Sequence, residues 1–361
     1  MTQIPIRPKR ITLLLLMCAL AASCTLPVPV LAPVDNIAPA QRDQPPGDAL
    51  VAGTTGLTSS EAATLASLEK VDAYPLYTMQ YHGDYVRNET ACAPERDSLF
   101  STDWACSLFA VLGDRDNMLF GRNFDWQYSP ALLLFTDPSE GHRSVSMVDI
   151  AYLGFAGENA RDLLDLPLNE RRSLLRAPFL PFDGMNERGL VVGMAAVPPG
   201  NKSPDPAKDT VGSLGIMRKI LDGAATVGEA VAIMEGVNID FGGGPSVHYL
   251  IADAAGRSVL VEYYRGDMVV IPNDELWQAA TNFLRSAAGA TAEVQCRRHD
   301  TISSQLQTSD GALSETEAMA LLADVAQPNT QWSIVYGISN GEINVAMGGD
   351  YGNVFRMKIM D

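Results

Sequence analysis

Cys106 begins a stretch whose residue types and spacing favour thiol chemistry. Residues 106–112 form an apolar run that predicts a β-strand, a turn rich in Gly, Asp and Asn follows, and residues 118–123 predict the returning strand of a hairpin. Arg122 stands sixteen residues after Cys106, and Asp125 three residues after that. The hairpin returns both beside Cys106, where a cation lowers the pKa of a thiol and a carboxylate orients an amine. We predict that Cys106 is a catalytic nucleophile.

A catalytic thiol needs a base, and the sequence does not identify any of the histidines as that base. The chain has four of them, His82, His142, His248 and His299. None stands in a recognisable protease signature, and the sequence has no Gly-x-Ser-x-Gly elbow. The α-amino group of an N-terminal residue has a pKa of about 8 and lies within hydrogen-bond reach of its own side chain. We expect cleavage of the Ala105–Cys106 bond to supply this base; a conventional Cys–His protease is the alternative.

The segment Gly-Arg-Asn-Phe-Asp-Trp at 121–126, with Cys106 before it, resembles the cysteine Ntn-hydrolases. This superfamily of linear amide C–N hydrolases includes choloylglycine (bile salt) hydrolase, penicillin V acylase, acid ceramidase and acyl-CoA:6-aminopenicillanic acid acyltransferase. Its pattern is a nucleophilic Cys followed by an Arg and an Asp at the offsets that Cys106, Arg122 and Asp125 show. The resemblance implies an α+β fold, the Ntn-hydrolase αββα sandwich of two antiparallel sheets between helical layers. It also implies autocatalytic cleavage before Cys106 and amide hydrolysis through a thioester acyl-enzyme.

Two further site residues rest on the resemblance. Thr281-Asn282 is similar to the family's Thr-Asn, whose Asn amide donates to the oxyanion, so the resemblance gives that role to Asn282. A second active-site Arg follows in the family, and Arg298 is the candidate here, with Arg297 as its rival. Both arginines are also consistent with surface charges at the start of a helix. Where some bile salt hydrolases have an active-site Asn, this chain has Ala196, so only its backbone N–H is left to serve an oxyanion.

Three other segments are expected to be structural. Asn186 lies in a segment similar to the family's Asn-Glu-x-Gly-Leu, and its side chain is expected to fix a turn. His248 lies in a predicted strand and is expected to pack there. Residues 129–135 form an apolar run that either lines an acyl pocket or is an ordinary core strand, and we favour the core strand.

The remaining pattern alternates strand and helix signals. Strands are predicted at 189–196, 247–253, 258–264, 332–338 and 342–347. Helices are predicted from Thr58 to about Val71, at 214–221, at 226–235 and at 314–325, with capping boxes completed by Glu61, Glu229 and Glu317. Strands in hairpins with helices between them indicate layers of antiparallel sheet covered by helices.

The first part of the chain predicts export rather than fold. Three basic residues precede the apolar run 11–20, which is too short to span a bilayer comfortably, and Leu-Ala-Ala-Ser then leads to Cys24. This resembles a bacterial lipobox, in which the Cys is acylated; ordinary cleavage after a small residue is the alternative. We predict a signal peptide at 1–23, a Pro/Ala-rich tether at 24–56, a pro-segment or light chain at 57–105 and the catalytic domain at 106–361. The expected location is the cell surface, through a lipid anchor at Cys24.

Composition narrows the classes of partner. The net charge of -17 and the absence of a basic block outside the N-terminus disfavour nucleic acid. No metal-ligand spacing occurs, so we expect no metal and no cofactor. Once Cys18 and Cys24 are set aside, an odd number of cysteines indicates one free thiol, and with Cys106 in that role Cys92 and Cys296 are either a disulfide or two reduced thiols.

The expected substrate is a small N-acyl amide with an apolar acyl group. Two other functions stay open at this stage. An acyltransferase would pass the acyl group to an amine, and a surface-anchored binding protein would keep the fold without catalysis.

Overall fold

The computed structural model describes residues 56–85, 105–155, 163–200, 203–242, 244–287 and 296–359. The predicted signal peptide, most of the predicted tether, the predicted acylation site Cys24, and Cys92 lie outside these residues. Cys296 carries a free thiol. No helix among the described residues combines the length and apolar character that a membrane crossing requires.

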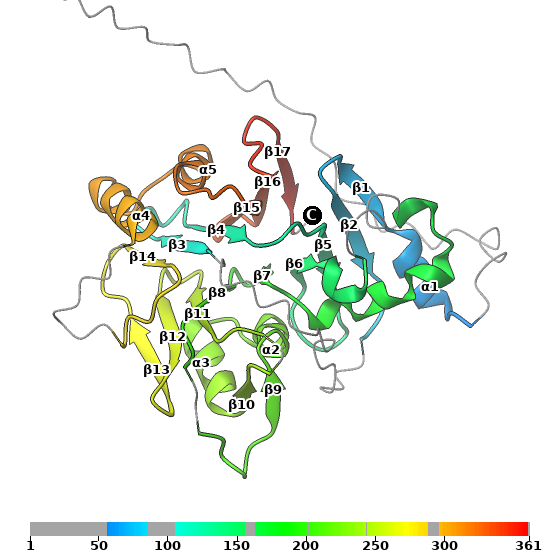
Figure 1. The fold of residues 1–361 in the computed structure, drawn as a ribbon, viewed down its shortest axis with the longest axis horizontal. Helices are drawn as coiled ribbons and strands as arrows, with labels where there is room; N and C mark the ends of the chain where they lie inside the picture. The colour runs from blue at the N-terminus through cyan, green and yellow to red at the C-terminus, as the bar shows by residue number, and fades with distance from the viewer. Residues whose placement is uncertain are drawn as a thin grey trace, which may run out of the picture. The chain divides into compact units, whose positions relative to one another are not determined.

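Two β-sheets form the centre of the fold (Figure 1). The larger sheet has the strand order β1 (Glu69–Asp72), β2 (Leu76–Tyr81), β5 (Ala131–Thr136), β6 (Ser144–Asp149), β7 (Asp183–Asn186), β8 (Val191–Ala196), β11 (Val247–Ala252), β12 (Ser258–Tyr264) and β13 (Asp267–Pro272). The smaller sheet has the order β14 (Trp277–Ala280), β3 (Ser107–Val111), β4 (Leu119–Asp125), β15 (Thr330–Gly337), β16 (Glu342–Met347) and β17 (Val354–Lys358). Neighbouring strands in these two sheets are antiparallel, except that β2 and β5 are parallel.

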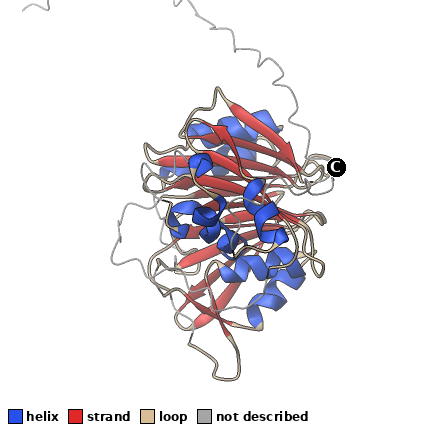
Figure 2. Ribbon diagram, turned by 90° about the vertical axis from the view of Figure 1, so that its right-hand side faces the viewer, coloured by secondary structure: helices blue, strands red, loops and turns tan. Residues whose placement is uncertain are grey.

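Helices cover the outer faces of both sheets (Figure 2). On the larger sheet, α2 (Gly215–Gly223) packs on β7 and β8, and α3 (Val227–Glu235) packs on β11 and β12. On the smaller sheet, α4 (Arg297–Thr308) packs on β14 and β3, and α5 (Glu315–Asp324) packs on β15 and β4. The layers are therefore helix, sheet, sheet and helix, and the predicted α+β sandwich is confirmed.

Smaller elements complete the described fold. Helix α1 (Ser59–Ala66) contacts the 3₁₀ helix η4 (Leu168–Phe179), and two short 3₁₀ turns are η1 (Ile150–Leu153) and η3 (Leu163–Asp165). Strands β9 (Thr210–Gly212) and β10 (Asn238–Asp240) form a separate parallel pair.

The hairpin of β3 and β4 has two apolar faces because it lies between layers. Leu108 and Phe120 belong to the hydrophobic cluster between the sheets, whereas Phe109 and Leu119 belong to the cluster under α4 and α5. Successive side chains of a strand point to opposite faces, so a strand covered on both sides reads as a continuous apolar run. At Gly121 a Cβ atom would lie only 2.2 Å from the ring of Phe109, so this position needs glycine.

The predicted helix starts agree with the structure. The capping boxes of Thr58 with Glu61, Thr226 with Glu229 and Ser314 with Glu317 are all formed. The predicted end of the first helix near Val71 is wrong, because α1 ends at Ala66 and Glu69–Asp72 pairs with β2 instead. The backbone hydrogen bonds of these residues therefore go to a neighbouring strand rather than along a helix.

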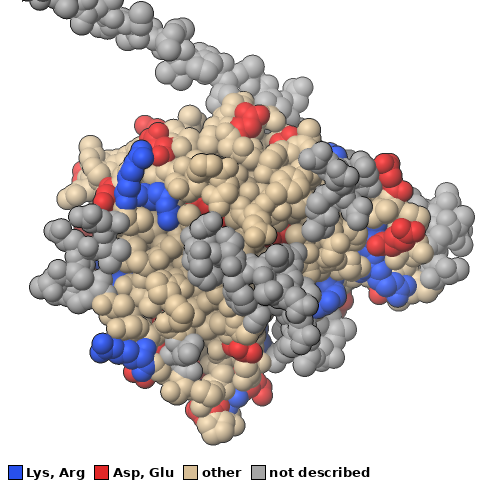
Figure 3. Space-filling view, viewed as in Figure 1, with Lys and Arg blue, Asp and Glu red and all other residues tan. Residues whose placement is uncertain are grey.

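The described residues before Cys106 are part of the same core as those after it. Leu76, Tyr77 and Met79 of β2 are buried, and β2 lies between β1 and β5 within the larger sheet. The boundaries predicted for the signal, tether and pro-segment remain predictions. On the face shown in Figure 3, basic side chains are few and stand among acidic ones.

Candidate functional site

Cys106 lies immediately before β3, with only 4% of its surface exposed. The register of the hairpin pairs Leu108 with Arg122 and Ser107 with Asn123, so the end of β4 returns beside Cys106 as the sequence predicts. The backbone N–H of Ala105 donates to the carbonyl oxygen of Asp125 at 3.4 Å, which extends the pairing past the predicted cleavage point. The Ala105–Cys106 peptide bond is thus held in line with β3.

Arg122 is fully buried and held on several sides. Its Nη1 donates to the carbonyl oxygen of Phe182 at 2.7 Å and forms an ion pair with the carboxylate of Asp183. Its guanidinium carbon lies 5.0 Å from the ring centroid of Phe124 and 5.9 Å from that of Trp332, and these two rings are stacked. A cation between a carboxylate and aromatic faces keeps its charge and has little freedom to move.

Asp183 is a site residue that the sequence analysis missed. Besides Arg122, its carboxylate accepts hydrogen bonds from the Tyr336 hydroxyl at 2.5 Å and from Trp332 Nε1 at 3.3 Å. A buried arginine requires a counter-ion, so a buried Arg122 already implied an acidic partner somewhere in the chain. Nothing in the chain's spacing selects Asp183 from the other acidic residues, because β7 meets β4 only across the two sheets.

The thiol of Cys106 experiences opposing electrostatic effects. Burial raises the pKa of Cys106, the Arg122 guanidinium acts to lower it, and the Asp125 carboxylate acts to raise it further. The net pKa is raised in this uncleaved chain. A thiol in this environment needs both the cation and a nearby base to form a thiolate.

Asp125 is buried at the end of β4. Its Oδ1 accepts a hydrogen bond from Thr330 Oγ1 at 2.5 Å, and its Oδ2 is buried without a hydrogen-bond partner among the described residues. Burial raises the pKa of Asp125 to about 6, against the lowering effects of Thr330, Arg298 and Arg122. A carboxylate with one open oxygen is suited to receive an amine.

Asn282 contacts the nitrogen of Cys106 directly. That nitrogen donates to Asn282 Oδ1 at 2.7 Å, and Arg298 Nη2 donates to the same oxygen at 2.9 Å. Asn282 Nδ2 donates to the carbonyl oxygen of Ala196 at 2.8 Å. Two donors on one side and a carbonyl on the other determine which way the amide points. The Cys106 nitrogen belongs here to the intact peptide bond, and it stands where cleavage would leave the α-amine.

Arg298, rather than its rival Arg297, lies at the site. Its Nη1 donates to the carbonyl oxygen of Cys106 and, at 3.0 Å, to Ser107 Oγ, whereas Arg297 is exposed. Arg298 stands in the first turn of α4, where a cation is disfavoured by the helix dipole. Its position is therefore explained by the contacts with Cys106, Ser107 and Asn282 and not by helix stability.

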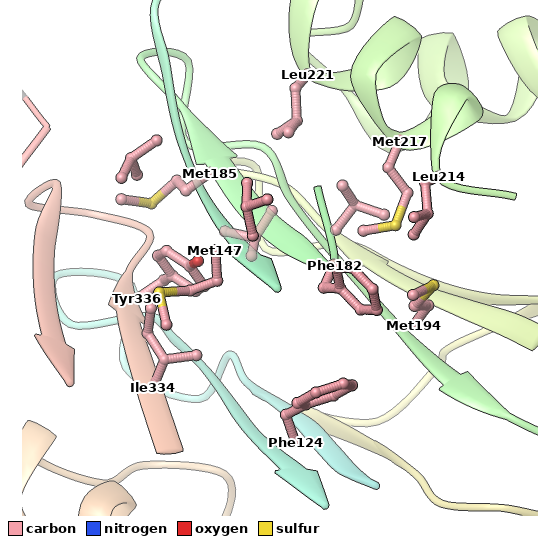
Figure 4. Packing of buried hydrophobic residues seen from close by; sticks show 14 of the residues in the cluster. Phe124, Met147, Phe182, Met185, Met194, Leu214, Met217, Leu221, Ile334 and Tyr336 are labelled. Carbon is pink, nitrogen blue, oxygen red and sulfur yellow. The ribbon is translucent and has the colours of Figure 1, made fainter. Parts of the chain in front are cut away.

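An apolar pocket opens beside the thiol. Besides Cys106 and Arg122, it is lined mainly by aromatic and apolar side chains: Phe124, Trp126, Tyr152, Phe182, Met194, Leu214, Pro245 and Val247. Figure 4 shows Phe182, Met194 and Leu214 gathered above Phe124. The apolar run at 129–135 does not line this pocket. Residues 131–135 belong to β5, a buried strand of the larger sheet, so the prediction of a core strand is confirmed.

The remaining predictions concern residues expected to be structural. Asn186 Oδ1 accepts the backbone N–H of Arg188 and of Leu190, which fixes the turn before β8. His248 is buried in β11, with 1% of its surface exposed, as predicted. Its ring faces Glu262.

Two of the other three histidine rings are also engaged away from Cys106. His142 faces Glu187, and His299 faces Ser303 and Asp300. Within the described chain, no hydrogen bond joins a histidine to Cys106. These contacts give no support to a Cys–His protease.

Comparison with known proteins gives a family match and similar folds. Residues 106–282 match the family described as linear amide C–N hydrolases, choloylglycine hydrolase family. A mutant of the conjugated bile acid hydrolase from Clostridium perfringens superposes with a TM-score of 0.52 at 14% identity, covering 70% of this chain and 92% of that one. Penicillin V acylase from Agrobacterium tumefaciens gives a TM-score of 0.49 at 19% identity, covering 70% of this chain and 86% of that one.

Proposed function

The chain belongs to the linear amide C–N hydrolases of the choloylglycine hydrolase family, and from that premise we propose that Cys106 is the nucleophile that cleaves its substrate. The enzyme is a hydrolase that acts on C–N bonds of linear amides. The observation that carries the proposal is the hydrogen bond from the Cys106 nitrogen to Asn282 Oδ1 at 2.7 Å, next to a buried thiol with a fixed cation. The nitrogen is oriented as a future base, and the sulfur faces an apolar pocket.

The first proposed step is self-cleavage. The Cys106 sulfur attacks the carbonyl carbon of Ala105, the C–N bond breaks, and the acyl group passes to sulfur as a thioester while the nitrogen becomes a free amine. Water hydrolyses this thioester and leaves the Ala105 carboxylate and the thiol of Cys106. Arg298, which contacts the Cys106 carbonyl, and Asn282, which contacts the nitrogen, hold both sides of the new N-terminus.

The same thiol then serves turnover. The α-amine of Cys106 takes the thiol proton, the thiolate attacks the amide carbonyl, and the amine returns the proton to the leaving nitrogen. Water releases the acyl group from the thioester. Arg122 stabilises the thiolate, and the open oxygen of Asp125 receives the charged amine. Donation from Asn282 Nδ2 to an oxyanion would replace its present bond to the Ala196 carbonyl.

The substrate is proposed to be an N-acyl amide with an apolar acyl group. The pocket beside the thiol offers rings and aliphatic side chains, which favour apolar surface. Two of its polar groups, Cys106 and Arg122, lie at the reacting end. An acyl group that fills the pocket would place its carbonyl carbon against the sulfur.

Two measurements test this function. Denaturing electrophoresis with N-terminal sequencing is expected to show a heavy chain that begins at Cys106, and the C106A variant is expected to stay intact. Profiling of amides that share one amine and differ in acyl group is expected to show a preference for apolar acyl groups, with C106A as the inactive control. An intact wild-type chain that still hydrolyses amides would contradict the scheme.

After cleavage, the two fragments are expected to remain together. The described residues before Cys106 supply two strands of the larger sheet and bury Leu76, Tyr77 and Met79. Separation would expose these side chains and the edge of β5. Gel filtration in native buffer is expected to yield one species that contains both fragments; a heavy chain that elutes alone with full activity would contradict this.

We also propose export and lipid anchoring at Cys24. The basic residues before the apolar run 11–20 and the Leu-Ala-Ala-Ser that precedes Cys24 support this. Labelling of cells with a fatty acid is expected to mark the wild-type protein and not the C24S variant. Release of unlabelled wild-type protein into the soluble fraction would favour ordinary signal cleavage.

A further inference from the structure

A buried carboxylate lies behind the site, on β12. Glu262 is fully buried and accepts three hydrogen bonds. The backbone N–H of Arg285 donates to Oε1 at 2.8 Å, the backbone N–H of Ser286 donates to Oε2 at 2.8 Å, and His248 Nδ1 lies 3.3 Å from Oε1. Burial acts to raise the pKa of Glu262, but the hydrogen bonds from His248, Ser286 and Arg285 outweigh it, and the pKa is lowered. The carboxylate is therefore charged at neutral pH and attracts all three donors.

His248 completes this arrangement from the neighbouring strand. It is buried on β11, and its Nε2 has no hydrogen-bond partner among the described residues. With Nδ1 protonated, the ring donates to Glu262 and leaves Nε2 as an unprotonated nitrogen, which is the less costly atom to leave unpaired. The role of His248 in the described structure is thus to orient one oxygen of Glu262.

The segment that Glu262 holds is the one that carries Asn282. Arg285 and Ser286 follow Asn282 by three and four residues, and the backbone N–H of Ala287 returns to the Leu284 carbonyl at 3.3 Å. Two adjacent N–H groups bound by one carboxylate fix the orientation of that turn. Because few bonds separate Asn282 from it, rotation of the turn would move the Asn282 backbone.

The Asn282 side chain tolerates little such movement. Its amide links the Cys106 nitrogen, Arg298 and the Ala196 carbonyl, at distances between 2.7 and 2.9 Å. Each of these partners lies on a different element, so a shift of Asn282 along any direction breaks at least one hydrogen bond. Asn282 is partly exposed, and its position depends on how its backbone is anchored.

We propose that Glu262, oriented by His248, is a positioning residue that fixes the 284–287 turn and thereby sets the Asn282 amide against the Cys106 nitrogen. This inference rests on the proposed function of Cys106. The pair acts through Asn282 and touches no reacting atom. Both self-cleavage and turnover use the Cys106 nitrogen, so both depend on Glu262.

The test compares E262Q with D253N, a matched control. Asp253 is also fully buried and accepts the backbone N–H of Val227 at 2.9 Å and of Ala255 at 3.0 Å, but it lies at the far end of the β11–β12 hairpin. In E262Q the new NH₂ group faces a backbone donor, so one hydrogen bond is lost and the turn shifts. We expect cleavage before Cys106 and kcat to fall roughly 10- to 100-fold, with KM essentially unchanged, because misplacement of reacting groups costs rate rather than binding.

D253N is expected to lower the melting temperature while leaving kcat and cleavage as in the wild type. An E262Q variant that loses only thermal stability, as D253N does, overturns the positioning role. A wild-type chain that is neither cleaved nor active refutes the proposed function and this inference together. A cleaved, active wild type with an equally active E262Q variant refutes only the inference.

His248 gives a second comparison that does not depend on E262Q folding. H248N keeps an amide N–H donor near the position of Nδ1, which faces Glu262, whereas H248L removes the donor. We expect H248L to lower kcat and slow cleavage and H248N to restore most of the loss. Equal rates in the two variants, whether both high or both low, would overturn the role given to His248.

Discussion

The candidate active site combines two regions that are held in different ways. Cys106, Arg122 and Asp125 belong to the β3–β4 hairpin and its ends, where β3 and β4 are buried along their whole length. Asn282 and Arg298 stand at the end of β14 and in the first turn of α4, and both are partly exposed. The region of the proposed nucleophile is built into the core, whereas the region that contacts the Cys106 nitrogen is held by side-chain contacts.

This difference has an energetic consequence. At Arg122 and Asp125 in the hairpin, a substitution changes a buried charge and so affects the free energy of unfolding together with the chemistry. At Asn282 and Arg298, solvent compensates lost hydrogen bonds in part, so a substitution affects the chemistry more than stability. Variants in the two regions therefore separate effects on catalysis from effects on stability.

The largest expected effect follows from C106A. Without the sulfur, neither self-cleavage nor turnover has a nucleophile, and we expect activity to fall on the order of 10⁴-fold or more. The sulfur is buried but the side chain is small, so the cavity left by one sulfur atom should cost only about 1 kcal/mol of stability. Mass spectrometry of the chain measures self-cleavage, and amide hydrolysis rates measure turnover. Residual activity near the wild-type level would remove Cys106 from its proposed role.

Arg122 is expected to affect both chemistry and stability. R122M removes the cation that lowers the Cys106 pKa and leaves the Asp183 carboxylate buried without its charge partner. We expect a loss of about 3–5 kcal/mol in the free energy of unfolding and roughly a 10²-fold fall in kcat.

The double variant R122M/D183N separates the two losses. It removes the unpaired charge, so urea denaturation should show much of the stability restored, whereas kcat should stay low. Recovery of activity in the double variant would show that Arg122 acts through stability alone.

The hairpin could be predicted from the sequence because it is formed by residues that lie close together in the chain. An apolar run, a turn and a returning strand determine that Arg122 lies opposite Leu108, whatever the rest of the chain does. Asn282 and Arg298 were located only through the family resemblance, since no local rule brings residues so far apart to Cys106. Asp183 and Glu262 were not found at all, because their partners lie on other strands and in loops. An acidic residue in a strand signals burial with a partner but does not identify the partner.

A neutral residue in place of Asp125 is expected to increase stability, whereas R122M is expected to decrease it. Burial raises the pKa of its carboxyl to about 6 in the uncleaved chain, above the value of about 3.9 expected when unfolded. The protonated form therefore favours folding: this stability is fully present below pH 4 and is lost as the pH rises through about 6. The difference between these two pKa values corresponds to at most about 3 kcal/mol of folding free energy, which is lost at high pH.

The measurement uses the C106A background, in which the peptide bond stays intact. D125N mimics the protonated group, so its melting temperature should exceed that of the parent above pH 6 and approach it near pH 4. In a chain that retains Cys106, D125N should slow turnover, because the neutral amide cannot balance the charged amine. A constant difference in melting temperature across this pH range would show that the Asp125 carboxyl does not titrate there.

Arg298 provides the smallest expected effect and the sharpest contrast with the hairpin. R298A removes the donors to the Cys106 carbonyl, Ser107 and Asn282, and we expect roughly a tenfold fall in kcat with a change below about 1 kcal/mol in stability. Its neighbour in the same helical turn, Arg297, is exposed, so R297A is the matched control and should retain the wild-type rate. Equal loss in both variants would mean that the first turn of α4 acts through its general charge. A large loss of stability in R298A would instead show that Arg298 contributes to folding as the hairpin residues do, which would contradict the difference between the two regions.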